Sequence, residues 1–260
     1  MSWTDAADPA RRIGRAVEFH PEIGSTNDRA RELVEGDGAG IAVVTDLQTA
    51  GRGRQGRRWV SPSGVNLMVS VGIRPRVAAR DAGLLGAAVA LAVADACRPW
   101  ADLRVRWPND LVTDDGTKVA GLLLETAVAG DEIALAVIGV GINVNWARSE
   151  MPVEIRPYAT SLGELAGAPV DRVDLLRVLL AALDEGIARL EAGDAPVERL
   201  RAISWLDGRD LDIDTGDGLV SGTGAGLADD GSLLLDTPDG RLALAHGEVR
   251  RVRPRDEVPA

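Results

Sequence analysis

The stretch "TAGRGRQGRRW", residues 49–59, sets four arginines among three glycines. Glycines let a loop curl so that its backbone N–H groups approach an anion closely. Guanidinium groups add paired donors that match the oxygens of a phosphate or a carboxylate. A solvated hinge and an RGG-like RNA-binding tract are the alternatives. The stretch lies between two apolar runs and is not repeated, which favours a site for a phosphate or carboxylate.

A second polar group follows a predicted strand. The run Trp-Pro-Asn-Asp at residues 107–110 places an amide beside a carboxylate at the end of that strand. Ligands tend to bind at such strand ends in α/β sheets. One carboxylate with phosphates nearby is also a usual way of holding Mg²⁺. A plain strand-ending turn is the alternative, and for these four residues alone it is the better explanation.

Lys118 is the only lysine in a chain with 29 lysine and arginine residues. A sequence so biased toward arginine has little use for lysine as a surface charge. We therefore predict that Lys118 lies where a compact ammonium is needed and a planar guanidinium will not serve. The chance survival of a single surface lysine is the alternative.

Apolar runs, their length and their periodicity predict the elements that must position these residues. Helices are predicted at 81–98 and 171–190, with shorter ones at 27–35, after a Ser-Thr-Asn start, and at 196–203. Strands are predicted at 17–19, 41–47, 66–73, 103–106, 111–112, 119–128 and 133–144. After residue 205, short alternating segments separated by Gly-Asp and Asp-Gly turns predict a small all-β unit.

The composition excludes several classes of protein. The chain has 260 residues, 45% hydrophobic and 27% charged, as in ordinary globular proteins. Its net charge of −11 argues against a general binder of nucleic acid or acidic membranes. The single cysteine, Cys97, excludes an intramolecular disulfide and is predicted to be a buried small residue. With no signal peptide and no apolar run of about 18 residues, we expect a cytoplasmic protein.

Five motifs, in order along the chain, resemble those of the biotin–protein ligases. They are Ser-Thr-Asn at 25–27, Gln-Thr-Ala-Gly-Arg-Gly-Arg at 48–54, Trp-Pro-Asn-Asp at 107–110, Lys-Val-Ala-Gly at 118–121 and Gly-Val-Gly-Ile-Asn at 139–143. The resemblance implies an α+β fold. A mixed-sheet catalytic domain of the biotin/lipoate ligase type is expected at 14–203, after a loose segment at 1–13. A small SH3-like β-barrel domain is expected at 206–254.

The resemblance also implies an ATP-dependent reaction in two steps. Biotin and ATP, with Mg²⁺, form biotinyl-5′-AMP, which then biotinylates a lysine of the biotin carboxyl carrier domain of an acyl-CoA or pyruvate carboxylase. No redox cofactor is implied. A lipoate–protein ligase or a related acyl transferase of the same superfamily is the nearest alternative. About 16 residues precede the first predicted strand, too few for the DNA-binding domain of some members. Neither DNA nor a membrane is expected as a partner, and a homodimer is left open.

By the same resemblance, the site residues divide among biotin, the nucleotide and the metal. Expected biotin contacts are Ser25, Thr26, Asn27, Gln48, Gly51, Arg52, Gly53, Arg54, Lys118 and Gly121. Expected nucleotide contacts are Arg54, Arg57, Trp59, Asn109 and Asn143, and Asp110 is expected to face the metal. The expected catalytic residues are Lys118, Arg52 and Arg54. The chain departs from the family at Arg106, where lysine is usual, so a role that needs a compact ammonium is not carried over to that position.

Overall fold

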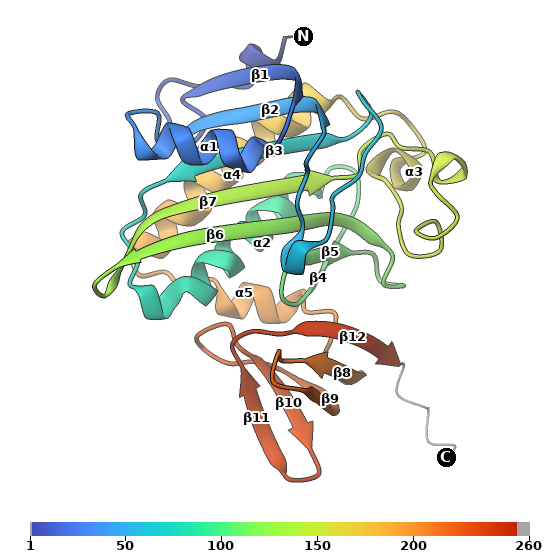
Figure 1. Cartoon of the computed structure of the whole chain (residues 1–260). Helices are drawn as coiled ribbons and strands as arrows, with labels where there is room; N and C mark the ends of the chain where they lie inside the picture. Colours follow the sequence, from blue (N-terminus) through green and yellow to red (C-terminus); the bar gives the residue numbers. More distant parts are fainter. Residues whose placement is uncertain (1, 254–260) are drawn as a thin grey trace.

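A seven-stranded mixed sheet forms the centre of the larger domain in the computed structural model, which describes residues 2–253 (Figure 1). Its strand order is β1-β2-β3-β7-β6-β5-β4. The strands are β1 (Ala16–Ile23), β2 (Ile41–Gln48), β3 (Leu67–Ile73), β4 (Arg104–Arg106), β5 (Asp110–Val112), β6 (Lys118–Ala129) and β7 (Glu132–Ile142). Strands β1 and β2 run parallel, and the other neighbouring pairs are antiparallel. The sheet with its helices is the predicted α+β arrangement.

Helices cover both faces of this sheet (Figure 1). They are α1 (Thr26–Glu35), α2 (Ala82–Cys97), α3 (Leu162–Ala166), α4 (Arg172–Glu191) and α5 (Val197–Ala202). Val43 of β2 packs with Ala30 and Val34 of α1, whereas the next residue, Val44, belongs to the main core with α2 and α4. Because successive side chains of a strand point to opposite faces, α1 lies on one face and α2 with α4 on the other.

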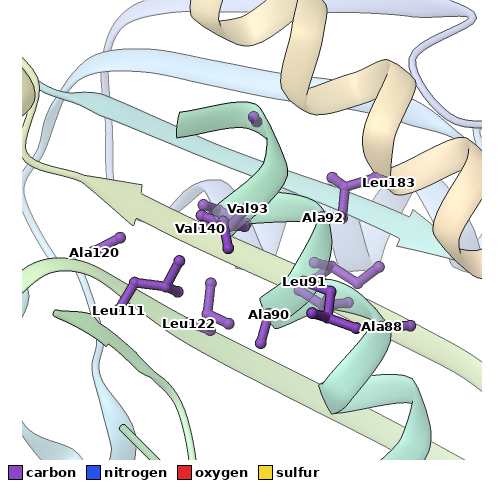
Figure 2. Close-up of a cluster of buried hydrophobic side chains, with 14 of the residues drawn as sticks. Ala88, Ala90, Leu91, Ala92, Val93, Leu111, Ala120, Leu122, Val140 and Leu183 are labelled. Carbon is purple, nitrogen blue, oxygen red and sulfur yellow. The ribbon is translucent and has the colours of Figure 1, made fainter. Parts of the chain in front are cut away.

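The main core lies between α2 and the sheet. Figure 2 shows Ala90 and Val93 of α2 near Ala120 and Leu122 of β6 and Val140 of β7. Small alanine side chains let the helix approach the strands closely, and the core on this face is therefore built from apolar side chains.

Cys97, at the end of α2, has no exposed surface, which confirms the prediction of a buried small residue. Burial raises the pKa of its thiol to about 12, so the group is not a nucleophile at neutral pH.

The C-terminal unit is a five-stranded antiparallel sheet in the order β11-β10-β9-β8-β12. Its strands are β8 (Asp210–Asp214), β9 (Leu219–Leu227), β10 (Leu233–Thr237), β11 (Gly240–Leu244) and β12 (Glu248–Arg253). The Trp205 N–H donates to the carbonyl of Val105 at 2.9 Å, and Arg201 Nε donates to the carbonyl of Leu227 at 2.8 Å. The first bond joins the segment before β8 to the edge strand β4, and the second joins α5 to β9. Residue 254, the predicted end of this unit, lies outside the described residues.

The N-terminal segment is more ordered than the expected loose stretch at 1–13. A 3-10 helix spans Trp3–Ala6, and both Ala6 and Ile13 are fully buried. The Ile13 N–H also donates to Asp184 of α4 at 2.9 Å. These two buried apolar residues hold the segment against the rest of the domain. The sequence did not predict them, because the residues around them are mostly polar. The first strand is likewise longer than predicted, because its polar residues lie at the sheet edge where water satisfies them. In the part of the chain that the structure describes, no helix is both long and apolar enough to cross a lipid bilayer.

Candidate functional site

A cavity of about 140 Å³ lies on the α1 face of the main sheet. Its floor is made by paired positions on three strands: Ser70 of β3 lies opposite Gly139 of β7, which lies opposite Leu123 of β6. Two residues along, Gly141 lies opposite Gly121. Side chains on this face alternate with those that enter the main core. Glycine at three of these positions leaves room above the strands for a ligand.

Most of the residues predicted for ligand binding meet at this cavity. Those that line it are Ser25, Thr26, Asn27, Gln48, Arg52, Gly53, Arg54, Arg57, Trp59, Asn109, Asp110, Lys118 and Gly121. Gly51 and Asn143 do not line it. A Cβ on Gly51 would lie 2.7 Å from the carbonyl oxygen of Trp59, so glycine there lets the two ends of the arginine loop close together.

Asn143 differs from its expected role as a nucleotide contact. Its side chain is buried, accepts a 3.4 Å bond from Asn66 Nδ2 and donates a 3.1 Å bond to the carbonyl of Thr160. These partners hold the amide inside the protein, where it joins β3, β7 and the segment before α3. From the sequence alone, an asparagine that binds a ligand at a strand end cannot be distinguished from one that hydrogen-bonds within the protein.

Uncharged polar side chains that line the cavity form a connected set, which ends on the carboxylate of Glu125. The Thr26 N–H donates to Gln48 Oε1 at 2.9 Å, and the hydroxyls of Thr26 and Ser70 lie 2.7 Å apart. Ser70 donates to Asn27 Oδ1 at 2.6 Å, and Asn27 Nδ2 donates to Glu125 at 2.8 Å. These bonds fix the side chains in place before a ligand arrives, which lowers the cost of binding.

Ser25 differs from its neighbours. It occupies the N-cap position of α1, as predicted, but its side chain makes no capping bond. The hydroxyl remains for a ligand.

Ser70 was missed in the sequence. It is the one hydroxyl in the fully buried strand β3, "LMVSVGI". A buried polar side chain is costly unless it has partners, and that isolated hydroxyl was the signal that could have identified it.

Trp59 forms a wall of the cavity because glycines leave it room. A Cβ on Gly141 would lie 2.6 Å from the Trp59 ring, and one on Gly121 would lie 3.0 Å from both the ring and Lys118 Nζ. The Lys118 ammonium stands 5.7 Å from the ring centroid, within the range of a cation–π contact. The Trp59 indole N–H is buried and has no partner among residues 2–253.

We predict that Gly141→Ala weakens binding of the cavity ligand about tenfold, because the new methyl group displaces Trp59 at a cost of roughly 1–3 kcal/mol. Titration calorimetry with biotin measures the effect. Gly186→Ala in helix α4 is the control, because the nearest atom to its new Cβ would be the carbonyl oxygen of Ala88 in α2, at an ordinary contact distance of 3.6 Å. Equal affinities for the Gly141→Ala variant and the unaltered protein would contradict the role given to this glycine.

The four arginines of the loop have different partners. Arg52 forms two bonds with Asp28, at 2.7 and 2.9 Å, and Arg57 pairs with Glu248 of the C-terminal sheet at 2.9 Å. Arg58 donates to the carbonyl of Thr49 at 3.3 Å. Within the described residues, the Arg54 guanidinium makes no ion pair and no hydrogen bond, although it is partly buried.

Burial lowers the pKa of Arg54, but a guanidinium remains charged at any physiological pH. Arg54 is therefore the loop cation most available to an anion in the cavity.

Asp110 is held between two cations. One carboxylate oxygen lies 2.6 Å from Lys118 Nζ, and the other accepts a 2.8 Å bond from Arg106. Burial alone would raise the pKa of Asp110, but Lys118 and Arg106 outweigh it and hold that pKa below its usual value. Arg106 itself does not line the cavity. The arginine at this position, where the family usually has lysine, therefore acts on the site only through its bond to Asp110.

This arrangement does not fit a dedicated metal site at Asp110. Both carboxylate oxygens already meet cations, and no cluster of three or more His, Cys, Asp or Glu side chains suited to a metal occurs between residues 2 and 253. Asn109, beside it, donates to the carbonyl of Leu122 at 2.8 Å and lines the cavity with its remaining surface.

Comparison with known proteins agrees with this site. Residues 21–143 match the model of the "Biotin/lipoate A/B protein ligase family". The biotin--[acetyl-CoA-carboxylase] ligase of Paracoccus denitrificans is 35% identical, over 86% of this chain and 96% of the relative. The bifunctional ligase/repressor BirA of Bacillus subtilis is 32% identical, over 91% of this chain and 74% of the relative. The solved biotin protein ligase from Aquifex aeolicus in complex with biotin and ATP is 29% identical with a TM-score of 0.76, covering 92% of this chain and 99% of that one. The chain therefore belongs to the biotin–protein ligases of the biotin/lipoate ligase family.

Proposed function

We propose that this enzyme joins biotin to ATP to form biotinyl-5′-AMP and then transfers biotin to a lysine of a biotin carboxyl carrier domain. The observation that carries the proposal is that one cavity is lined both by uncharged polar groups and by cations. Ser25, Thr26 and Gln48 lie with the uncharged polar groups, and Arg54 and Lys118 supply cations beside them. Biotin has groups that suit both: a neutral ureido ring at one end and a carboxylate at the other.

In the first step, a carboxylate oxygen of biotin attacks the α-phosphorus of ATP, the bond to the β-phosphate breaks, and pyrophosphate leaves. Two anions must approach each other, and their repulsion at about 4 Å is of order 4 kcal/mol at an effective dielectric constant of 20. An ammonium has three donors, and Asp110 occupies one of those of Lys118. Two donors remain, one for the carboxylate and one for the phosphate.

Arg54 is suited to the developing negative charge on the α-phosphate, because its five donors have no protein partner in the described part of the chain. In the second step, the acceptor amine attacks the acyl carbon and loses a proton, the acyl C–O bond breaks, and AMP leaves with the bonding electrons and the negative charge. We propose that Mg²⁺ enters with the phosphates of ATP. No step is assigned to a metal held by Asp110, and the C-terminal sheet is proposed to be SH3-like.

The experiment that tests this function supplies the purified protein with biotin, Mg-ATP and a carrier domain, and weighs the carrier by mass spectrometry. We expect one biotinyl group per carrier and release of pyrophosphate. Parallel reactions with lipoate test the nearest alternative, because the dithiolane ring of lipoate has no groups that pair with the hydroxyls of Ser25 and Thr26. Modification by lipoate and not by biotin would overturn the proposal.

A further inference from the structure

A carboxylate of the C-terminal sheet reaches the arginine loop of the catalytic domain. Glu248 is the first residue of β12, and its side chain is only 10% exposed. Its Oε1 atom lies 2.9 Å from Arg57 of the loop and 3.3 Å from Arg250 of its own strand. Its Oε2 atom is buried and has no hydrogen-bond partner in residues 2–253.

The backbone before Glu248 is packed tightly enough to fix where this carboxylate lies. A Cβ on Gly247 would lie 2.8 Å from the Ile213 side chain and 3.4 Å from the ring of Trp107. Trp107 begins the Trp-Pro-Asn-Asp turn that carries Asp110 into the active site. The start of β12 therefore contacts both the turn and, through Glu248, the arginine loop.

The loop has few other anchors at this end. Gly53 N–H donates to the carbonyl of Arg57 at 2.7 Å, so residues 53–57 close as a small turn that carries Arg54. The other end is tied by Arg52 to Asp28. Arg57 is the only residue of 53–57 with a described ion pair to another element.

A buried carboxylate with one unpartnered oxygen is unfavourable unless nearby cations compensate it. Arg54 and Arg57 are both close enough to interact electrostatically with Glu248 and with each other. Like charges on adjacent arginines repel, and a carboxylate beside them offsets that repulsion. Arg57 is exposed, and an ion pair between two exposed side chains would contribute little to holding the loop. A positioning role therefore depends on the burial of the Glu248 side chain.

We propose that Glu248 is a positioning residue for adenylate formation: from the C-terminal sheet it holds Arg57, and thereby keeps the loop closed with Arg54 directed at the phosphate end of the cavity. This inference rests on the proposed function for its catalytic consequence. Its structural half, that Glu248 holds the loop, does not depend on that function.

The test compares Glu248→Gln with Asp236→Asn, a control in the same sheet whose carboxylate pairs only with the exposed Arg241 in the structure described. Hydrogen exchange of residues 51–58 is measured in ligand-free protein, and KM for ATP and for biotin is measured by pyrophosphate release. In Glu248→Gln we expect faster loop exchange and a KM for ATP raised about tenfold, as for loss of a charge-assisted bond. KM for biotin should change less than twofold, and the control should match the unaltered protein.

A charge exchange gives an independent check. Arg57→Glu alone should open the loop, and combining it with Glu248→Arg should restore slow exchange of residues 51–58. Unchanged loop exchange in Glu248→Gln, or equal changes in the control, would overturn the proposal. So would faster exchange with an unchanged KM for ATP in an active enzyme. If the unaltered protein lacks ligase activity altogether, the proposed function fails, and the exchange data still decide whether Glu248 holds the loop.

Discussion

Replacing Lys118 with arginine is expected to leave the fold intact and to slow adenylate formation about 10²- to 10³-fold, the cost of losing one stabilising donor in a transition state. The charge is conserved, so the loss arises from shape. Lys118 Nζ lies 2.6 Å from Asp110 and 5.7 Å from the centroid of the Trp59 ring. A guanidinium is wider than an ammonium and spreads its charge over a plane, so it cannot fit between carboxylate and phosphate oxygens in that space.

Pyrophosphate release by the purified Lys118→Arg variant measures this effect, with the melting temperature recorded alongside. The matched control is Arg104→Lys, a change of the same two residue types at a surface pair with Asp114, where exposed charges contribute little. Turnover within twofold of normal for Lys118→Arg would contradict a catalytic role for the ammonium. A large fall in melting temperature would instead assign Lys118 to the stability of the Asp110 cluster.

The fold was largely predictable because its main elements are either long apolar runs or amphipathic segments. The helix predicted at 81–98 spans Ala82–Cys97, and the strand predicted at 41–47 spans Ile41–Gln48. The features that were not predicted are buried residues and a helix that belong to no long apolar or amphipathic segment. The fully buried Ala6 and Ile13 stand alone in a polar segment, and α3 has only five residues.

The site was predictable in its residue types but not in its pairing. The loop contains four arginines, and nothing in their spacing distinguishes Arg54 from Arg52 or Arg57. Residues distant in the sequence make that distinction, because Arg52 forms an ion pair with Asp28 and Arg57 forms one with Glu248. Asp110 was expected to face a metal, but it pairs with two cations. The register of β4, β5 and β6 brings those cations to Asp110, and one sequence does not reveal that register.

The pairing of the arginines leads to the second large effect, which concerns Arg54. We expect Arg54→Ala to weaken retention of biotinyl-5′-AMP about 10- to 100-fold, the range for a hydrogen bond to a charged group. Binding of free biotin should fall less than threefold, because its ring is proposed to lie with the uncharged polar groups of the cavity. The protein should remain stable, since Arg54 has no ion pair in the described structure to lose.

Calorimetry with biotin and with a non-hydrolysable analogue of the adenylate gives the two affinities, and their ratio is the quantity that decides. Arg177→Ala serves as the control, because Arg177 is an exposed arginine of α4 that pairs with Asp174. Removing Arg54 leaves the α-phosphate without its guanidinium but does not touch the ureido contacts, so the two affinities must separate if the cavity is divided as proposed. Equal losses for biotin and the analogue would mean that Arg54 acts on the shared carboxyl end or on the loop as a whole, and the phosphate would then depend on Lys118 alone.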